Sequence, residues 1–127
     1  MEKIEKLDQV ILESKYNNRP FSLDVTYRPD GLPKPIILHI HGFKGFKDWG
    51  YFNQLADHAA GKGFVFIKMN FSHNGTTPDD PLDFVDLEAF GSNNFSIEQS
   101  DMGTVIDYVF ADDFAVHKNE LDLGRFY

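Results

Sequence analysis

The stretch that decides the fold is Lys34-Pro-Ile-Ile-Leu-His-Ile-His-Gly-Phe-Lys-Gly-Phe-Lys-Asp-Trp49. Its apolar first half predicts a buried strand from Pro35 to His41, and its two glycines predict a loop from Gly42 to Trp49. Continuous apolar strands of this kind occur in parallel sheets that are covered on both faces. Because ligands of such sheets bind beyond the carboxyl ends of the strands, this loop is where we expect function.

A helix and a second strand are predicted to follow. Apolar residues recur at helical spacing from Tyr51 to Ala60, and Phe64 to Met69 has the pattern of another buried strand. Strand, helix and strand within about 35 residues form a βαβ unit, whose two strands are parallel. The predicted fold class is therefore α/β, with a mainly parallel sheet flanked by helices.

The N-terminal part predicts an antiparallel β-hairpin. Val10 to Lys15 and Phe21 to Tyr27 are short runs of the β type, separated by Asn17-Asn18-Arg19-Pro20. Asparagine pairs and proline favour tight turns. The hairpin therefore precedes the βαβ unit along the chain.

The C-terminal part predicts a loop, a helix and the opening of a strand. Asn70 to Asn94 is rich in turn-forming residues and is expected to be one long irregular loop. Ser96 is a candidate helix cap, and the helix is expected to fade near Ala111 to Phe114. Leu121 to Tyr127 has the pattern of another strand.

Composition narrows the class of protein. The 127 residues suit one domain, are 42% hydrophobic, carry a formal charge of -8 and include no cysteine. The acidity argues against nucleic acid or an anionic membrane as partner, and the lack of cysteine excludes thiol chemistry and disulfides. No apolar segment approaches the roughly 20 residues of a membrane span, and the N-terminus has no leader pattern. We expect a cytoplasmic protein without a cofactor.

The order of these elements resembles the N-terminal part of an α/β-hydrolase. A hairpin precedes a strand ending in His41-Gly42, and a helix and a strand follow. The family then has Asp-x-x-Gly-His-Gly, where this chain has Asn70-Phe-Ser-His-Asn-Gly75, so that Asn70 replaces the usual Asp and Asn74 the usual His. The helix that carries Glu98 and Asp101 resembles the family's next helix. The resemblance covers residues 8 to 127 and is nearest to bacterial serine esterases and to dienelactone-hydrolase-like or peptidase-like hydrolases.

The resemblance implies an oxyanion hole in the loop. The backbone N–H of Phe43 would supply half of it, and Gly42 would allow the turn because a Cβ atom would obstruct it. Substrate contacts are expected from His41, Lys44, Trp49 and His73, although His41 and His73 could instead order their loops. Lys44 and Lys47 lie beside glycines without a phosphate-loop pattern, so solvated side chains are the expectation for both.

The catalytic triad of the family is not found in this sequence. No serine has glycine two residues before and two after it, so the nucleophile elbow is missing. The resemblance places nucleophile, acid and histidine beyond Tyr127, in a protein that cleaves a small ester or amide. The 127 residues alone are then expected to be inactive. The Pro35–His41 strand would also lie at a sheet edge unless the tail covers it, which would favour a homo-oligomer or pairing with the missing half.

Two other functions remain open at this stage. One is a non-catalytic binding module that pairs with a partner through an open sheet edge. The other is metal-dependent hydrolysis, because His39 and His41 alternate on one strand and could be joined by His73 and by Asp79 or Asp80. The spacing of the remaining ligands has no metal-site signature, and hydrogen-bonded histidines are the simpler interpretation.

Overall fold

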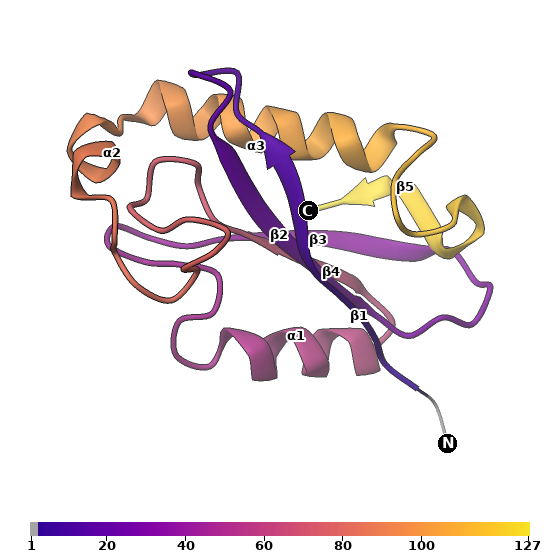
Figure 1. Cartoon of the computed structure of the whole chain (residues 1–127). Helices are drawn as coiled ribbons and strands as arrows, with labels where there is room; N and C mark the ends of the chain where they lie inside the picture. Colours follow the sequence, from indigo (N-terminus) through magenta and orange to yellow (C-terminus); the bar gives the residue numbers. More distant parts are fainter. Residues whose placement is uncertain (1–2) are drawn as a thin grey trace.

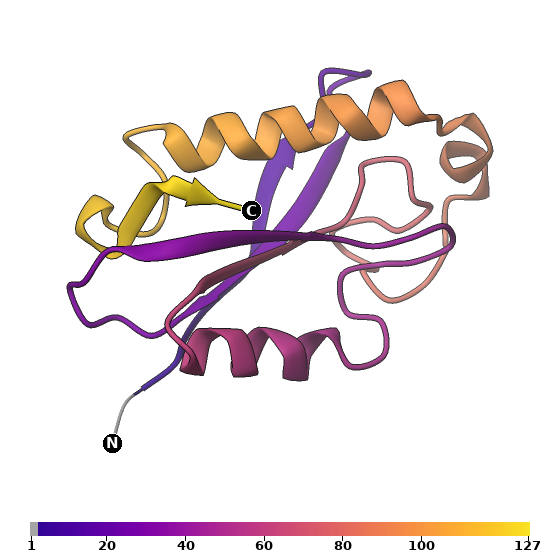
Figure 2. The ribbon, with the colours of Figure 1, turned by 180° about the vertical axis from the view of Figure 1, so that it is seen from behind.

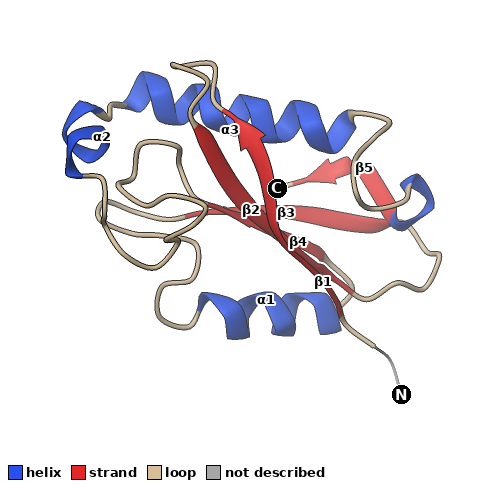
Figure 3. Cartoon of the chain, viewed as in Figure 1, coloured by secondary structure: helices blue, strands red, loops and turns tan. Residues whose placement is uncertain are grey.

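A five-stranded mixed sheet lies between two helices in the computed structural model, which describes residues 3–127 (Figures 1 and 3). The order of the strands is β1-β2-β4-β3-β5. Helix α1 covers one face and α3 covers the other, as both views show (Figures 1 and 2). The elements along the chain are β1 (Glu5–Glu13), β2 (Pro20–Tyr27), β3 (Lys34–Ile40), α1 (Phe52–Gly61), β4 (Val65–Met69), α2 (Leu87–Ser92), α3 (Phe95–Phe110), a 3-10 turn (Lys118–Glu120) and β5 (Leu121–Phe126).

The predicted hairpin is confirmed, with a different first strand. β1 pairs antiparallel with β2, and the turn places Asn17 and Asn18 in the left-handed region, with φ of 61° and 51°. Asparagine tolerates this region better than most residues. β1 covers Glu5–Glu13 rather than Val10–Lys15. Its charged N-terminal half was not recognised as strand, although charges are common on edge strands.

The predicted βαβ unit is also confirmed. β3 pairs parallel with β4, and α1 connects them. β5 then pairs parallel with the other side of β3: the Tyr127 N–H donates to the Ile36 oxygen at 2.7 Å, and the Leu38 N–H donates to the Tyr127 oxygen at 2.8 Å. The tail therefore covers β3, and the edges of the described sheet are β1 and β5.

The main hydrophobic core lies where β2, β3 and β4 meet α3. Its members are apolar side chains from alternate strand positions and from one stripe of the helix, among them Leu23, Val25, Ile36, Ile67, Met69, Val105 and Val109. A smaller cluster joins α1 to the sheet through Ala56, Ala59 and Phe66. Burial on both faces explains the continuous apolar runs of β3 and β4.

The segment from Asn70 to Asn94 is not one irregular loop. It contains α2, whose first turn is capped by Asp86, because the Asp86 carboxylate accepts the Ala89 N–H at 3.0 Å. The cap of α3 is Asn94, which accepts the Ile97 N–H at 3.0 Å, and Ser96 lies inside the helix. Asparagine and serine cap helices about equally well, so the sequence does not distinguish the two starts.

One carboxylate joins α3 to two other segments. Asp101 is fully buried and accepts the Ser14 hydroxyl at 2.7 Å and the Ser72 N–H at 2.8 Å. Ser14 follows β1, and Ser72 follows β4. This contact therefore fixes the hairpin and the segment after β4 relative to the helix. Within residues 3–127, no helix has the length and apolar character needed to cross a membrane.

Replacing Asp101 with alanine should destabilise the fold. Two buried donors would lose their acceptor, at a cost of about 1–3 kcal/mol in the free energy of unfolding. Asp107→Ala is the matched control, because Asp107 is exposed on the same helix and should change stability by no more than about 0.5 kcal/mol. Urea denaturation of both variants checks this, and equal midpoints would show that the buried contact contributes nothing.

Candidate functional site

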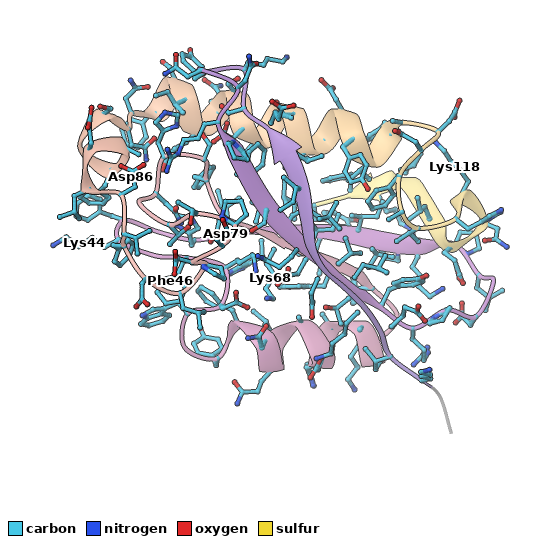
Figure 4. The ribbon with its side chains drawn as sticks, in the orientation of Figure 1. Lys44, Phe46, Lys68, Asp79, Asp86 and Lys118 are labelled. Atoms are coloured by element: carbon cyan, nitrogen blue, oxygen red, sulfur yellow. The ribbon has the colours of Figure 1, made fainter. Side chains whose placement is uncertain are left out.

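Two loops meet at the carboxyl ends of β3 and β4. The loop after β3 leads into α1, and the segment after β4 leads into α2 (Figure 1). Both lie at the same end of the sheet, where ligands bind in open α/β sheets. Figure 4 labels Lys44 and Phe46 on the first loop, and the Lys44 side chain points away from the sheet.

The first loop begins with a tight turn over residues 42–45. The Gly45 N–H donates to the Gly42 oxygen at 2.9 Å, and Lys44, the third residue of the turn, has a positive φ of 59°. A positive φ at this position is typical of type II turns. Phe43, the second residue, has an 85% exposed side chain. No hydrogen bond among residues 3–127 uses the Phe43 N–H, so this donor is free.

The glycine that the turn requires is Gly45 and not Gly42. A Cβ atom on Gly45 would lie 2.9 Å from the Gly42 oxygen and 3.0 Å from the His41 Cβ. A Cβ atom on Gly42 would meet nothing within 4 Å. The predicted steric reason for Gly42 is therefore wrong. Gly42 is instead one of the residues that line an open cleft beside the turn.

His41 holds the base of the loop. It is buried, its Nε2 atom accepts the Phe71 N–H at 3.2 Å, and its Nδ1 atom lies 2.9 Å from the Gly42 oxygen. These two contacts assign the neutral ring with the proton on Nδ1. Burial lowers the pKa of His41, although the bond to Gly42 acts in the opposite direction. The ring therefore links the two loops while it is neutral.

Two asparagines hold the loop from the other side. The Asn70 side-chain oxygen accepts the Lys47 N–H at 2.7 Å. The Asn74 oxygen accepts both the N–H and the hydroxyl of Thr76, at 2.9 and 2.7 Å, and its amide nitrogen lies 3.4 Å from the Gly45 oxygen. Asn70 and Asn74 therefore both contact the loop that carries Phe43.

An apolar cleft opens beside the turn. It has a volume of about 360 Å³ and is lined by His41, Gly42, Phe43, Lys44, Asn74, Phe90, Asn93, Asn94, Phe95 and Glu98. The Phe43 and Phe90 rings are 5.6 Å apart, and the Phe95 side chain is 88% exposed. A second hollow of about 690 Å³ continues along Ile40, Phe71 and Met102. The free Phe43 N–H thus belongs to a residue that lines a mainly apolar cleft.

The four residues predicted to contact substrate are not all at this cleft. His41 and Lys44 line it. Trp49 lies against Phe52 of α1, with ring centroids 5.7 Å apart, and is not among the lining residues. His73 faces a separate polar hollow beside Arg19 and pairs with the Ser72 hydroxyl at 2.7 Å. No contact with substrate is tested for any of the four, so these roles stay predictions.

The histidines considered for a metal site have different surroundings. His39 packs between Phe52 and Phe66, with centroids 4.3 and 5.7 Å away, and its buried Nε2 atom has no partner among the described residues. His41 and His73 are engaged with Phe71 and Ser72, as described above. In the part of the chain that the structure describes, no three potential ligands are grouped to hold a metal ion.

Lys47 is buried rather than solvated, which corrects the prediction made from the loop composition. Its side chain is 3% exposed, and its Nζ atom pairs with Asp24 at 3.0 Å and with Asp48 at 2.9 Å. Lys68 of β4 pairs with the same two carboxylates. The sequence carried one signal of this arrangement, since Lys68 interrupts the otherwise apolar strand β4.

Comparisons with known proteins identify the fold. No protein-family model and no curated protein matches the sequence. Among solved structures, esterase Est22 has a TM-score of 0.65 at 16% identity, covering 98% of this chain and 33% of that protein. A putative dienelactone hydrolase from Klebsiella pneumoniae subsp. pneumoniae MGH 78578 has a TM-score of 0.63 at 12% identity, and the match covers 98% of this chain and 48% of that protein. A cold-adapted esterase from an Arctic intertidal metagenomic library has a TM-score of 0.64 at 18% identity, and the match covers 89% of this chain and 49% of that protein.

At these identities the likeness concerns the fold. The neighbours are esterases and a dienelactone hydrolase, and the chain spans between a third and a half of their lengths. The chain therefore has the fold of the N-terminal part of an α/β-hydrolase, as predicted.

Alanine at position 45 should destabilise the loop, whereas alanine at position 42 should not. The new Cβ atom of Gly45→Ala meets backbone atoms, and such overpacking costs about 1–3 kcal/mol in the free energy of unfolding. Gly42→Ala is the matched control and should change it by no more than about 0.5 kcal/mol. Urea unfolding of both variants measures the difference. If Gly42→Ala lost more stability than Gly45→Ala, Gly42 and not Gly45 would be the glycine that the turn requires.

Stability should fall as the pH falls below about 6.5. Burial lowers the pKa of His39, His41 and His73 in the folded chain, while the unfolded chain binds protons near pH 6.5. Between these values the unfolded state holds more protons, so acid favours unfolding. Urea midpoints measured from pH 8 to 5 should be level above pH 7 and decline below it. A level midpoint down to pH 5 would contradict the lowered pKa of these three histidines in the folded chain.

Proposed function

We propose that this chain is the N-terminal part of a serine hydrolase that cleaves ester or amide bonds, with the Phe43 N–H as one donor of its oxyanion hole. One observation carries the proposal: this N–H is free and belongs to a turn at the carboxyl end of β3, beside an apolar cleft. The fold of the neighbouring esterases supports it.

The proposed chemistry needs a fixed donor. When a nucleophile attacks an ester or amide, negative charge develops on the carbonyl oxygen, and a donor already in place lowers the barrier without reorganising. The Gly42–Gly45 turn and the contacts of His41, Asn70 and Asn74 hold the loop that carries this donor. The Phe43, Phe90 and Phe95 side chains line the apolar cleft beside this donor.

The register of β5 supports a position for the nucleophile. Tyr127 lies opposite Ile37, because it bonds to Ile36 and Leu38. In a longer chain that continues β5 in this register, the residue about five positions after Tyr127 would reach the level of Gly42. A Gly-x-Ser-x-Gly elbow there would bring its serine beside Phe43. Nucleophile, acid and histidine would then all come from beyond Tyr127, and residues 1–127 alone would be inactive.

A second candidate function follows from the edge of the sheet. β5 has β3 on one side and no described strand on the other. A non-catalytic module could use this edge to pair with another chain, or two copies could pair with each other. Size-exclusion chromatography of the 127-residue chain tests pairing between two copies. A stable monomer in dilute solution would count against it. A cytoplasmic location belongs to the proposal as a further prediction.

Proline at position 43 tests the proposed donor in the protein encoded by the complete gene. Phe43→Pro removes the N–H, and proline suits the second position of a type II turn, so the backbone should stay in place. Loss of one oxyanion donor should lower kcat by about 10²–10³-fold, with a much smaller change in KM. Hydrolysis of a p-nitrophenyl ester measures both constants.

Phe43→Ala is the matched control, because it removes the same aromatic ring and keeps the N–H. It should retain kcat within about tenfold of wild type and alter KM instead, since it acts through uniform binding. If Phe43→Pro and Phe43→Ala lower kcat equally, the N–H is not the donor and the proposed role of Phe43 is wrong.

A further inference from the structure

Four charged side chains, three of them buried and one partly exposed, form a closed ring between the sheet and the loop that carries Phe43. Lys47 pairs with Asp24 at 3.0 Å and with Asp48 at 2.9 Å. Lys68 pairs with Asp24 at 2.8 Å and with Asp48 at 3.0 Å. The side chains are between 2% and 17% exposed. We call Asp24, Lys47, Asp48 and Lys68 the charge quartet.

The charge quartet joins the loop to the sheet. Asp24 lies on β2 and Lys68 on β4, two strands that pair with each other, and Figure 4 shows Lys68 on the sheet. Lys47 and Asp48 lie on the loop, a few residues after Phe43. Each lysine bonds to one carboxylate of the sheet and one of the loop. Displacing the loop would therefore break two ion pairs at once.

The Asp24 carboxylate is fully engaged. Besides the two lysines on Oδ2, its Oδ1 atom accepts the Gln9 N–H at 2.8 Å. Gln9 lies in a register shift of β1 between Leu7 and Val10 and has a positive φ of 57°. The irregularity turns a strand N–H toward the carboxylate. The regular pairing of the edge strand β1 is therefore interrupted at Gln9, the residue whose N–H bonds to Asp24.

Fold stability is a weak reason for this arrangement. Buried ion pairs lose solvation when they leave water, and apolar residues of similar volume often serve stability as well or better. The hydrophobic core on the α3 side of the sheet is built from apolar side chains. Ion pairs do, however, fix direction and distance more sharply than apolar contacts, and catalysis loses about 10²-fold for a displacement near 1 Å. The quartet therefore suits positioning.

We propose that the charge quartet is the positioning device of the loop, holding the Phe43 N–H in one place relative to the sheet. Asp24, Lys47, Asp48 and Lys68 are then positioning residues and touch no substrate. This inference rests on the proposed function for its catalytic meaning, while its physical content is the order of the loop.

The test removes the sheet half of the quartet from the 127-residue chain. The double variant Asp24→Asn/Lys68→Met keeps the net charge, and the asparagine side chain introduced on β2 still offers an oxygen to the Gln9 N–H. Lys47 and Asp48 keep each other but lose both partners on the sheet. The readout is the ¹⁵N order parameter of the Phe43 and Lys44 amides, with the urea midpoint measured in parallel.

The matched control removes an exposed pair of the same chemistry. Lys6 and Asp57 are 2.7 Å apart with side chains 46% and 48% exposed, and Lys6→Met/Asp57→Asn also keeps the net charge. Wild type and control should show order parameters of about 0.85 at Phe43 and Lys44, and the quartet variant should fall below about 0.6. The amides of β3 and β4 should keep their order, which a general loss of stability would not allow.

A single variant, Asp48→Asn, tests the proposal if the double variant does not fold. Asp48→Asn leaves Asp24 with both lysines and should lower the same two order parameters, whereas Asp57→Asn should leave them unchanged. Wild-type order at Phe43 and Lys44 in either folded quartet variant overturns the proposal. Because the readout needs no catalysis, a lack of hydrolase activity in the protein encoded by the complete gene would overturn the proposed function and leave this result standing.

Discussion

The Asp24 carboxylate, buried in the middle of β2, is the constraint on which the candidate site depends. A buried carboxylate needs partners of opposite charge. Two lysines pair with Asp24, Lys68 from β4 and Lys47 from the loop after β3. Asp48 pairs with the same two lysines, so the four charges sum to zero. Burial raises the pKa of Asp48, but the hydrogen bonds from Lys47 and Lys68 outweigh it and keep this pKa below the usual value. The loop therefore lies where the charges require it.

The rest of the site follows from the position of the loop. With Lys47 fixed, its N–H reaches Asn70, and the turn at residues 42–45 comes to lie over His41 and Asn74. The segment after β4 contacts this loop through two neutral asparagines, Asn70 and Asn74. Here the charges lie within the quartet, and neutral groups contact the turn. This arrangement leaves Phe43 exposed, with its N–H free, at the edge of the cleft.

Much of the fold could be predicted because it depends on local patterns. The apolar runs of β3 and β4 and the helical spacing of α1 are properties of adjacent residues, and the structure confirms them. The start of α3 was misplaced because Asn94 and Ser96 are equally good caps. The N-terminal half of β1 was not predicted because its charged residues have a weak strand propensity, which the pairing with β2 outweighs in the folded chain.

The candidate site was less predictable because its determinants are far apart in sequence. Lys47 is bonded to a carboxylate 23 residues away, and nothing in the composition of its loop distinguishes it from a solvated lysine. The roles of Gly42 and Gly45 differ only in what lies next to each Cβ position, which is a property of the folded turn. The place where we looked for the candidate site follows from the parallel strands alone, because their carboxyl ends meet at one end of the sheet.

The most direct test of the central claim is to label the protein encoded by the complete gene with a fluorophosphonate and to locate the modified residue by mass spectrometry. The account predicts a single labelled serine within about ten residues after Tyr127, inside a Gly-x-Ser-x-Gly sequence. A reading frame that stops at Tyr127, or a labelled serine within residues 1–127, would contradict it.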